Sequence, residues 1–396
     1  MTARAEASAT VAPATPAARG SATAAGRLIS LDVFRGATVA AMLLVNAPGS
    51  WSAIYPPLRH AEWNGWTPTD LIFPFFLFIV GVTTHLSLMA RRKRGDDERA
   101  LVRQVLRRGV VIIVLGLLVS AFPFFPRDWI AHLRIPGVLQ RIGVVYLCAG
   151  LIVLRSPPRT QLLIAGAILV GYWLLLALAP VPGVGPAALA PPDATLAAWL
   201  DRLLLGGHLW PETRTWDPEG ILATVPAVAT ALLGAAAGRR LTRPEPLSVR
   251  LNQLFGAGAI ATVGGLVWSW GFPINKNLWT SSYVVFTAGL AAMSLATCTW
   301  LIEERKAAWW VHPFVVFGVN PITAFVGSEL AARLIYTVVR VPYGGASVPV
   351  ETAVFRAAFA SWLPARAASL AFAIVFVACW YVVLAALWRR RIILKV

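Results

Sequence analysis

The chain has 396 residues, of which 58% are hydrophobic and only 13% are charged, and its mean hydropathy is +0.68. This composition excludes a soluble globular domain, because such a domain needs far more polar side chains to cover its exterior. The formal net charge of +17 therefore has to be explained within a membrane protein.

Apolar runs of about 20 residues recur along the sequence, which is the length needed to cross a hydrocarbon core ~30 Å thick. Because backbone groups in lipid must form hydrogen bonds within the chain, we predict that each run is a helix. The predicted fold is all-α, a polytopic membrane helix bundle. Its ten predicted spans are 30–47, 68–90, 104–122, 137–154, 161–180, 219–238, 252–270, 279–302, 313–337 and 367–388.

The basic residues predict the orientation of the bundle. If the N-terminus is cytoplasmic, 23 of the 35 Lys and Arg residues fall in the two tails and the even-numbered connections, as the positive-inside rule requires when both termini are inside. The net charge thus indicates topology and allows contact with anionic lipid headgroups, and it gives no reason to expect nucleic acid as a partner. On this map His60 faces outward.

Residues 1–27 are rich in Ala, Thr, Ser and Pro and lack apolar periodicity, so we predict a disordered cytoplasmic tail before a transmembrane domain at 28–396. The three cysteines, Cys148, Cys298 and Cys379, all fall within predicted spans, where cysteine usually packs as a small apolar residue. We therefore expect neither a disulfide framework nor a metal site.

The segment 46–74 joins the first two spans and holds an imidazole, two carboxamides and two carboxylates. His60 is the leading candidate for chemistry, because imidazole can accept a proton near neutral pH. A lone loop histidine is more often an interfacial hydrogen-bonding residue, so both interpretations stay open.

Three polar neighbours of His60 are further candidates for chemistry. Asn46, at a helix end, and Asn64 could donate hydrogen bonds to a carbonyl oxygen that gains negative charge. Asn64 precedes a glycine, and Asn-Gly is also ordinary turn chemistry. Asp70 suits the positive end of a helix dipole, or it could orient His60 or bind a basic substrate.

Polar groups inside the membrane are costly, so each is a candidate site. Asp32 and Arg35 stand three apart on one helix face and predict an ion pair near the cytoplasmic interface. Arg134 and Arg141 bracket the start of the fourth span. Arg141 and the adjacent Gln140 should face the bundle interior.

Later polar groups cluster in the eighth and ninth spans. They comprise residues 275–282 and Asn320-Pro321, followed by Glu329. A helix broken at Asn-Pro would expose backbone groups only beside a cavity. The outer segments 181–218 and 338–366 suit ordered loops over a pocket. No convincing internal repeat is present, which argues against a transporter built from inverted halves.

Eight motifs, taken in order, resemble the heparan-alpha-glucosaminide N-acetyltransferase family. They are 31–36 (LDVFRG), 44–46 (LVN), 60–65 (HAEWNG), 69–74 (TDLIFP), 134–141 (RIPGVLQR), 217–220 (DPEG), 275–282 (NKNLWTSS) and 318–321 (GVNP). The resemblance covers about residues 28–390. It implies transfer of an acetyl group from cytosolic acetyl-CoA to an amino sugar across the membrane. It also implies that His60 matches the catalytic histidine and Asn46 the nearby helix-end asparagine.

We accordingly assign candidate roles to the polar residues, with no metal. The catalytic candidates are His60, Asn46 and Asp70. The substrate-binding candidates are Asn64, Trp63, Arg134, Glu219, Asn275 and Lys276. The candidates for binding acetyl-CoA are Arg141, Gln140, Asn320 and Ser281.

Two mechanisms fit these roles, namely deprotonation of the amine by His60 or a transient acetyl group on His60 itself. The chain starts at the first family span, so it resembles a bacterial member in the cytoplasmic (inner) membrane. The segment between Asn46 and His60 is longer than in the lysosomal enzyme and carries three prolines, which leaves the acceptor open. A homodimer is a possible assembly. The alternatives are an amino-sugar transporter or permease accessory and an O-acetyltransferase of envelope glycans.

Overall fold

The computed structural model describes residues 28–125 and 129–394, so the predicted tail at 1–27 lies outside the described residues. Thirteen α-helices occur there: α1 Ile29–Asn46, α2 Ile72–Lys93, α3 Glu98–Ala121, α4 Val138–Arg155, α5 Pro158–Leu178, α6 Leu196–Leu205, α7 Ile221–Leu241, α8 Leu247–Trp268, α9 Ser281–Thr299, α10 Val311–Val319, α11 Pro321–Arg333, α12 Val350–Ala358 and α13 Ala365–Arg389. Short 3-10 helices lie at Pro56–Leu58, Pro68–Leu71, Trp129–His132 and Pro192–Ala194, and π-helical turns at Trp300–Glu304 and Leu334–Val338.

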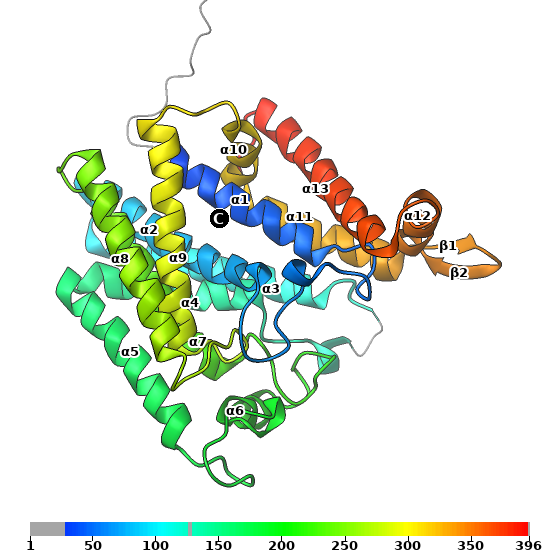
Figure 1. The fold of residues 1–396 in the computed structure, drawn as a ribbon, viewed down its shortest axis with the longest axis horizontal. Coiled ribbons are helices and arrows are strands. Elements are labelled where there is room, and N and C mark those ends of the chain that lie inside the picture. The colour runs from blue at the N-terminus through cyan, green and yellow to red at the C-terminus, as the bar shows by residue number, and fades with distance from the viewer. Residues whose placement is uncertain (1–27, 126–128, 395–396) are drawn as a thin grey trace, which may run out of the picture.

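The predicted all-α membrane bundle is confirmed. Within the described ranges, nine helices are long and apolar enough to cross a membrane, and a tenth span results if the bent pair α10–α11 counts as one. One local departure is a hairpin of two antiparallel strands, β1 Arg340–Tyr343 and β2 Ala346–Pro349. This hairpin and α12 project from one corner of the bundle, at the right of Figure 1.

Long helices pack in adjacent pairs, most extensively α8 with α9, α2 with α7, α3 with α4 and α1 with α10. Glycines allow the closest approach between α2 and α7. A Cβ atom on Gly81 would lie 1.9 Å from the carbonyl oxygen of Ala231, and one on Gly234 would lie 2.0 Å from that of Phe78. Small residues at such crossings let membrane helices approach backbone to backbone.

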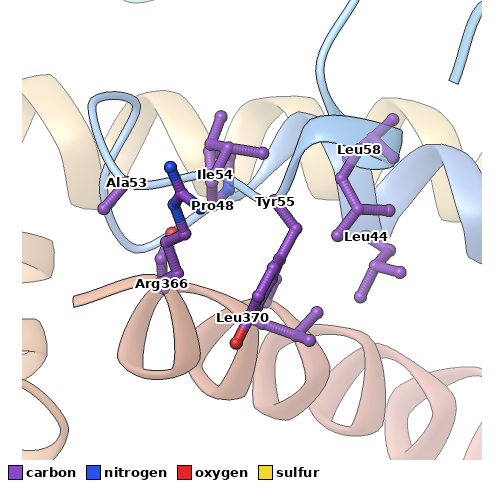
Figure 2. A pocket seen from close by; sticks show the side chains of 11 residues that line it. Leu44, Pro48, Ala53, Ile54, Tyr55, Leu58, Arg366 and Leu370 are labelled. Carbon is purple, nitrogen blue, oxygen red and sulfur yellow. The ribbon is translucent and has the colours of Figure 1, made fainter. Parts of the chain in front are cut away.

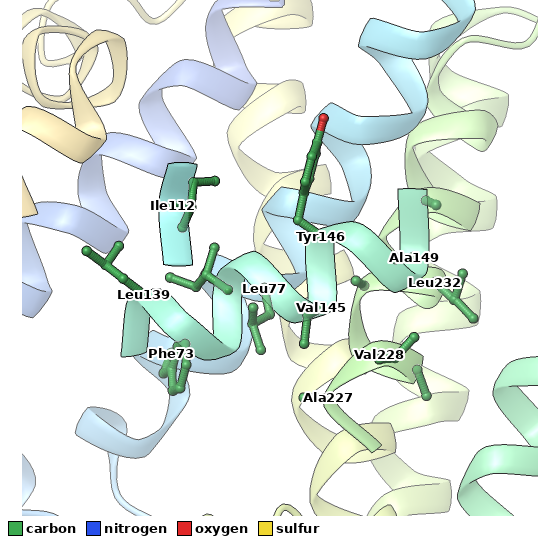
Figure 3. Close-up of a cluster of buried hydrophobic side chains, with 14 of the residues drawn as sticks. Phe73, Leu77, Ile112, Leu139, Val145, Tyr146, Ala149, Ala227, Val228 and Leu232 are labelled. Carbon is green, nitrogen blue, oxygen red and sulfur yellow. The ribbon is translucent and has the colours of Figure 1, made fainter. Parts of the chain in front are cut away.

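The main apolar core lies where α2, α3, α4 and α7 meet. Figure 3 shows Phe73 and Leu77 of α2 beneath α4, with Ile112 of α3 facing Leu139 and with Leu232 of α7 near Ala149. All of these side chains are buried. This core fixes the relative positions of the helices whose ends carry the polar residues described below.

The ninth predicted span is broken, as the Asn-Pro sequence indicates. The axes of α10 and α11 differ by 81° across Asn320. Pro321 is the first residue of α11, a position whose N–H has no partner within the helix, so the missing N–H of proline costs no hydrogen bond. The Asn320 side chain donates to the carbonyl of Ile392 (3.1 Å) and accepts from the amide of Leu394 (3.1 Å), so it ties the break to the C-terminal segment.

The connections between spans form two sets, one at each end of the bundle. At one end the amide of Gly65 donates to the carbonyl of Ile274 (2.8 Å), and the amide of Ile135 donates to the carbonyl of His208 (3.0 Å). At the other end Arg239 at the close of α7 donates to Gln161 at the start of α5 (2.8 Å). We call the first end, which holds His60, the histidine end. Its assignment to the outer side of the membrane stays a prediction.

Candidate active site

His60 and Asp70 form the centre of the histidine end. Asp70 lies in the 3-10 turn Pro68–Leu71, which a reciprocal capping box with Thr67 begins. Its Oδ1 lies 2.7 Å from His60 Nδ1, and its Oδ2 accepts from the amides of Ala61 and Thr67, each at 3.0 Å. Asp70 is 1% exposed, whereas the His60 side chain is 50% exposed.

This pairing fixes the chemistry of the imidazole. A buried carboxylate that receives two backbone N–H groups stays an acceptor, so His60 Nδ1 carries the proton and donates it to Asp70. Nε2 then keeps a lone pair that can act as a base. Of the two interpretations of Asp70, the structure supports the one in which it orients His60, in addition to capping its turn.

Lys276 brings an amine to the same imidazole. Its Nζ lies 3.1 Å from His60 Nδ1, 3.3 Å from Nε2 and 3.8 Å from Asp70 Oδ1, and its side chain is 16% exposed. An atom in line with the Nε2 lone pair would lie much farther from Nδ1 than from Nε2, so Lys276 Nζ, almost equally far from both nitrogens, lies off that direction. Burial lowers the pKa of Lys276, and the negative charges of Glu219 and Asp70 oppose that effect without cancelling it.

Two asparagines join the His60 loop to the lysine segment. Asn275 Nδ2 donates to Asn64 Oδ1 (3.1 Å), while Asn275 Oδ1 accepts from the amide of Leu278 (2.9 Å). The Asn64 amide nitrogen therefore keeps its donors for another acceptor. Asn64 is exposed and Asn275 is buried, so Asn275 holds the position and Asn64 faces the open side.

Tryptophans connect the same loop to the segment before α7. Trp63 Nε1 donates to the carbonyl of Leu189 (2.8 Å), and its ring meets Trp216 edge to face at 5.2 Å. Trp210 packs against Trp216 in turn (6.3 Å) and lies under the guanidinium of Arg134 at 5.7 Å. Trp63 thus has a structural role between loops, and its predicted contact with substrate stays a prediction.

Arg134 and Glu219, both predicted to bind substrate, are paired with each other. The Arg134 guanidinium contacts both oxygens of Asp217 (2.6 and 2.9 Å) and Glu219 Oε2 (2.5 Å). Burial would lower the pKa of Arg134, but its pairing with Asp217 and Glu219 raises it. Burial would raise the pKa of Glu219, but the positive charges of Arg134, Arg141 and Lys276 lower it. These contacts hold the segment that leads into α7.

Arg141 faces the bundle interior, as predicted, and is 2% exposed. Its guanidinium donates to the carbonyl of Gly220 and to Thr224, each at 3.3 Å, and lies 5.0 Å from the centre of the Trp279 ring. Its Nη1 is buried and has no hydrogen-bond partner among the described residues. Phe73 stacks against Trp279 beside it (5.1 Å), close to Asp70 in sequence.

A cavity of about 70 Å³, measured as space for water-sized molecules, lies between α1, α2, α3, α4 and α11. Its wall is mostly apolar, with Phe73 and Leu139 toward the histidine end and Met42 and Phe325 midway. Arg35 and Arg108 line its other part. Arg35 is bound to Asp32 (2.5 Å), which confirms the predicted ion pair, and the buried Nε of Arg108 has no hydrogen-bond partner within the described ranges.

Asn46 lies one helical turn beyond Met42 of the cavity wall. Its amide donates to Glu329 Oε1 (3.3 Å), and Glu329 in turn lies one turn beyond Phe325. Both polar groups line a small separate hollow that shares Met42 and Phe325 with the cavity. The following loop is seated on α13, where Tyr55 lies over Leu370 and Arg366 extends toward Ala53, while Leu58 lies near Leu44 of α1 (Figure 2).

The four residues predicted to bind acetyl-CoA do not line this cavity. Arg141 and Asn320 are engaged as described above, Gln140 donates to Ser120 (3.2 Å), and Ser281 donates to the carbonyl of Leu169 (2.6 Å). Arg108, which stands ten residues into α3 and within the predicted span 104–122, was not among the predicted site residues. A cation within an otherwise apolar span was the signal that could have identified it.

Comparison with known proteins agrees with the resemblance seen in the motifs. A family model described as "Heparan-alpha-glucosaminide N-acetyltransferase, catalytic" matches residues 27–266. Heparan-alpha-glucosaminide N-acetyltransferase of Homo sapiens is 31% identical over 358 residues, which cover 77% of this chain and 53% of that protein. The Mus musculus protein of the same name is 31% identical over 360 residues, covering 77% and 54%. The chain thus spans about half the length of these relatives.

Proposed function

Because the chain belongs to the heparan-alpha-glucosaminide N-acetyltransferase family, we propose that it transfers an acetyl group from cytosolic acetyl-CoA to the amine of an amino sugar outside the membrane. Under this proposal the protein is a multi-pass protein of a bacterial cytoplasmic membrane. The single observation that carries the proposal is the imidazole of His60, which buried Asp70 contacts through Nδ1 at 2.7 Å and whose side chain is half exposed.

The cavity supports a route for the acetyl donor. Acetyl-CoA is too highly charged to cross lipid, so its phosphates should stay near basic residues while the pantetheine arm carries the acetyl group inward. Arg35 and Arg108 can hold phosphate, since guanidinium groups form charge-assisted bonds to phosphate oxygens. Met42, Ile112 and Phe325 offer apolar contact to the arm.

The residues around His60 support the chemistry of transfer. The acceptor amine must lose a proton to attack the thioester carbonyl, and His60 Nε2 can take it. As the tetrahedral oxyanion forms, the Asn64 amide and the second N–H of the Asn46 amide, whose first N–H donates to Glu329, can stabilise it. The acetyl carbon then leaves sulfur for nitrogen, and the thiolate of CoA takes up a proton.

A transfer assay tests the proposal. Purified protein in lipid vesicles is incubated with acetyl-CoA and a panel of amino sugars, and the N- and O-acetylated products are separated by mass spectrometry. We expect N-acetylated product from wild-type protein, and a rate about 10²–10⁴-fold lower for His60→Ala. Arg59→Ala, a change of the exposed neighbour, serves as the matched control. Substantial turnover by a folded His60→Ala protein would contradict the role of His60.

A further inference from the structure

The chain contains four lysines, Lys93, Lys276, Lys306 and Lys395. Lys93 and Lys306 are exposed and lie in the connections at the end of the bundle opposite His60. Lys276 alone among the described lysines lies at the histidine end, and its side chain is largely buried. The protein therefore carries an internal primary amine beside the imidazole proposed to activate a primary amine.

The distances place the lysine amine where an acceptor amine has to be. A general base must lie within about 2.6–3.2 Å of the atom that gives up the proton. Lys276 Nζ is 3.3 Å from His60 Nε2, and the Asp70 carboxylate that orients the ring is 3.8 Å from the same nitrogen. A small rotation of the flexible lysine side chain brings Nζ in line with the Nε2 lone pair.

The surroundings also favour a reactive state of this amine. Only a neutral amine attacks a thioester, and burial lowers the pKa of Lys276 against the opposing charges of Glu219 and Asp70. The mostly buried position keeps bulk water from competing for the acetyl group. An exposed lysine at the opposite end, such as Lys93, has neither the burial nor a neighbouring base.

We infer that Lys276 is itself an acetyl acceptor, and that acetyl-CoA acetylates it when no amino sugar occupies the site. The inference rests on the proposed function. In the step, Nζ forms a bond to the acetyl carbon and the carbon–sulfur bond breaks. One Nζ proton passes to His60 Nε2, and the CoA thiolate takes up a proton, so that an uncharged acetyllysine and free CoA result.

This modification is a dead end rather than an acetyl carrier. An amide does not pass its acyl group to another amine, unlike an acetylimidazole. Acetylated Lys276 would lose its positive charge beside Asp70 and Glu219 and would place an acetyl group next to His60, so the enzyme would inactivate itself. An amino sugar bound at His60 should displace Lys276 and protect it.

Peptide mass spectrometry tests the inference. Vesicle-reconstituted wild-type protein is incubated with acetyl-CoA alone, or with acetyl-CoA and glucosamine, and acetylation is followed at each lysine. We expect Lys276 to be acetylated at least about tenfold faster than Lys93 and Lys306 without sugar, and several-fold more slowly with it. In His60→Ala the rate at Lys276 should fall to that of the other lysines. Lys276→Arg keeps the charge and shows the background.

The outcomes separate the inference from the function on which it rests. If glucosamine is acetylated while Lys276 stays unmodified without sugar, the self-acetylation is wrong and the proposed transfer stands. Equal acetylation of Lys276 in wild-type, His60→Ala and heat-denatured protein would mark simple chemical modification and overturn the inference. Absence of both products would reject the proposed function and the self-acetylation together. Label on wild-type protein that glucosamine removes would place the acetyl group on His60 instead.

Discussion

Asp70 holds the imidazole of His60 through one carboxylate oxygen and its own turn through the other. Oδ1 lies 2.7 Å from His60 Nδ1, while Oδ2 accepts from the amides of Ala61 and Thr67. Only a carboxylate can accept on both sides. An asparagine would have to turn its oxygen toward the two backbone amides and its nitrogen toward His60.

Asp70→Asn should therefore invert the histidine tautomer. With a donor facing Nδ1, the proton moves to Nε2 and the base is lost, so we expect kcat to fall about 10²–10⁴-fold while acetyl-CoA binding changes little. Steady-state kinetics and binding of acetyl-CoA by calorimetry provide the measurement. Thr67→Ala disturbs the same capping box without facing His60, and it should retain most activity. Wild-type kcat in Asp70→Asn would disprove the tautomer argument.

Arg108 gives a prediction about donor binding. If its guanidinium holds a phosphate of acetyl-CoA, Arg108→Gln should weaken acetyl-CoA binding by about tenfold or more, because a charge-assisted bond contributes about 1.5–3 kcal/mol. Binding of acetyl-pantetheine, which lacks the nucleotide phosphates, should not change. Arg103→Gln on the same helix is the control, since Arg103 is exposed and lines no part of the cavity. Equal loss for both ligands would indicate a damaged cavity instead.

The sequence predicts local features well and long-range pairings poorly. Hydropathy alone places the spans, and Asp32 with Arg35 can be paired because helix geometry fixes neighbours three apart. Arg134 and Asp217 are separated by 83 residues, and only the packing of the helices between them decides that they meet. For the same reason Arg134 and Glu219, each a plausible substrate ligand alone, turn out to satisfy each other.

The candidate site divides in the same way. His60 and Asp70 are ten residues apart in one connection, so two neighbouring sequence motifs supply the partners. The amine of Lys276 comes from 216 residues away, and its closeness to His60 could not be deduced from spacing. Arg108 lies within the predicted span 104–122, but its place on the cavity wall depends on how α3 packs with α4 and α11, which sequence spacing does not give.

The predicted orientation can be measured directly. We expect tags at both termini to be cytoplasmic, and a cysteine at Ser52 in a cysteine-free background to react with an impermeant maleimide from outside the cell. Ser52 is exposed in the His60 connection, and Ser248 is exposed at the start of α8 on the opposite end. Ser248→Cys should react only after permeabilisation. The reverse pattern would put His60 on the cytoplasmic side.

The contact between α2 and α7 predicts a selective loss of stability. Gly81→Ala places a methyl group 1.9 Å from the Ala231 carbonyl oxygen, so the two helix backbones must separate. Overpacking of this kind costs about 1–3 kcal/mol, and we expect a lower Tm in detergent. Gly166 in α5 has no atom within 4 Å of its added Cβ. Gly166→Ala should therefore leave Tm unchanged, and an equal loss in both variants would contradict the packing argument.

Asp201 in α6 makes stability depend on pH. The carboxylate is 1% exposed, and its Oδ1 accepts from the amide of Ile221 at the start of α7 (2.9 Å). Burial, aided by the charge of Asp217, raises the pKa of Asp201 to about 6, against the hydrogen bond from Ile221 and the charge of Arg141. In an unfolded chain the pKa of an aspartate is about 3.9.

The direction in which stability changes with pH follows from these two pKa values. Between about pH 4 and pH 6 the folded protein holds a proton that the unfolded chain releases, so the contribution of Asp201 is present below that range and is lost as the pH rises through it. The full loss is at most about 3 kcal/mol.

Asp201→Asn cannot ionise and keeps an oxygen for the Ile221 amide. Its Tm in detergent should match wild type at pH 4 and exceed it by several degrees at pH 7.5, whereas Asp193→Asn, at an exposed carboxylate in the same segment, should change little at either pH. A lower Tm of Asp201→Asn at pH 7.5 would mean that the charged carboxylate stabilises α6 against α7.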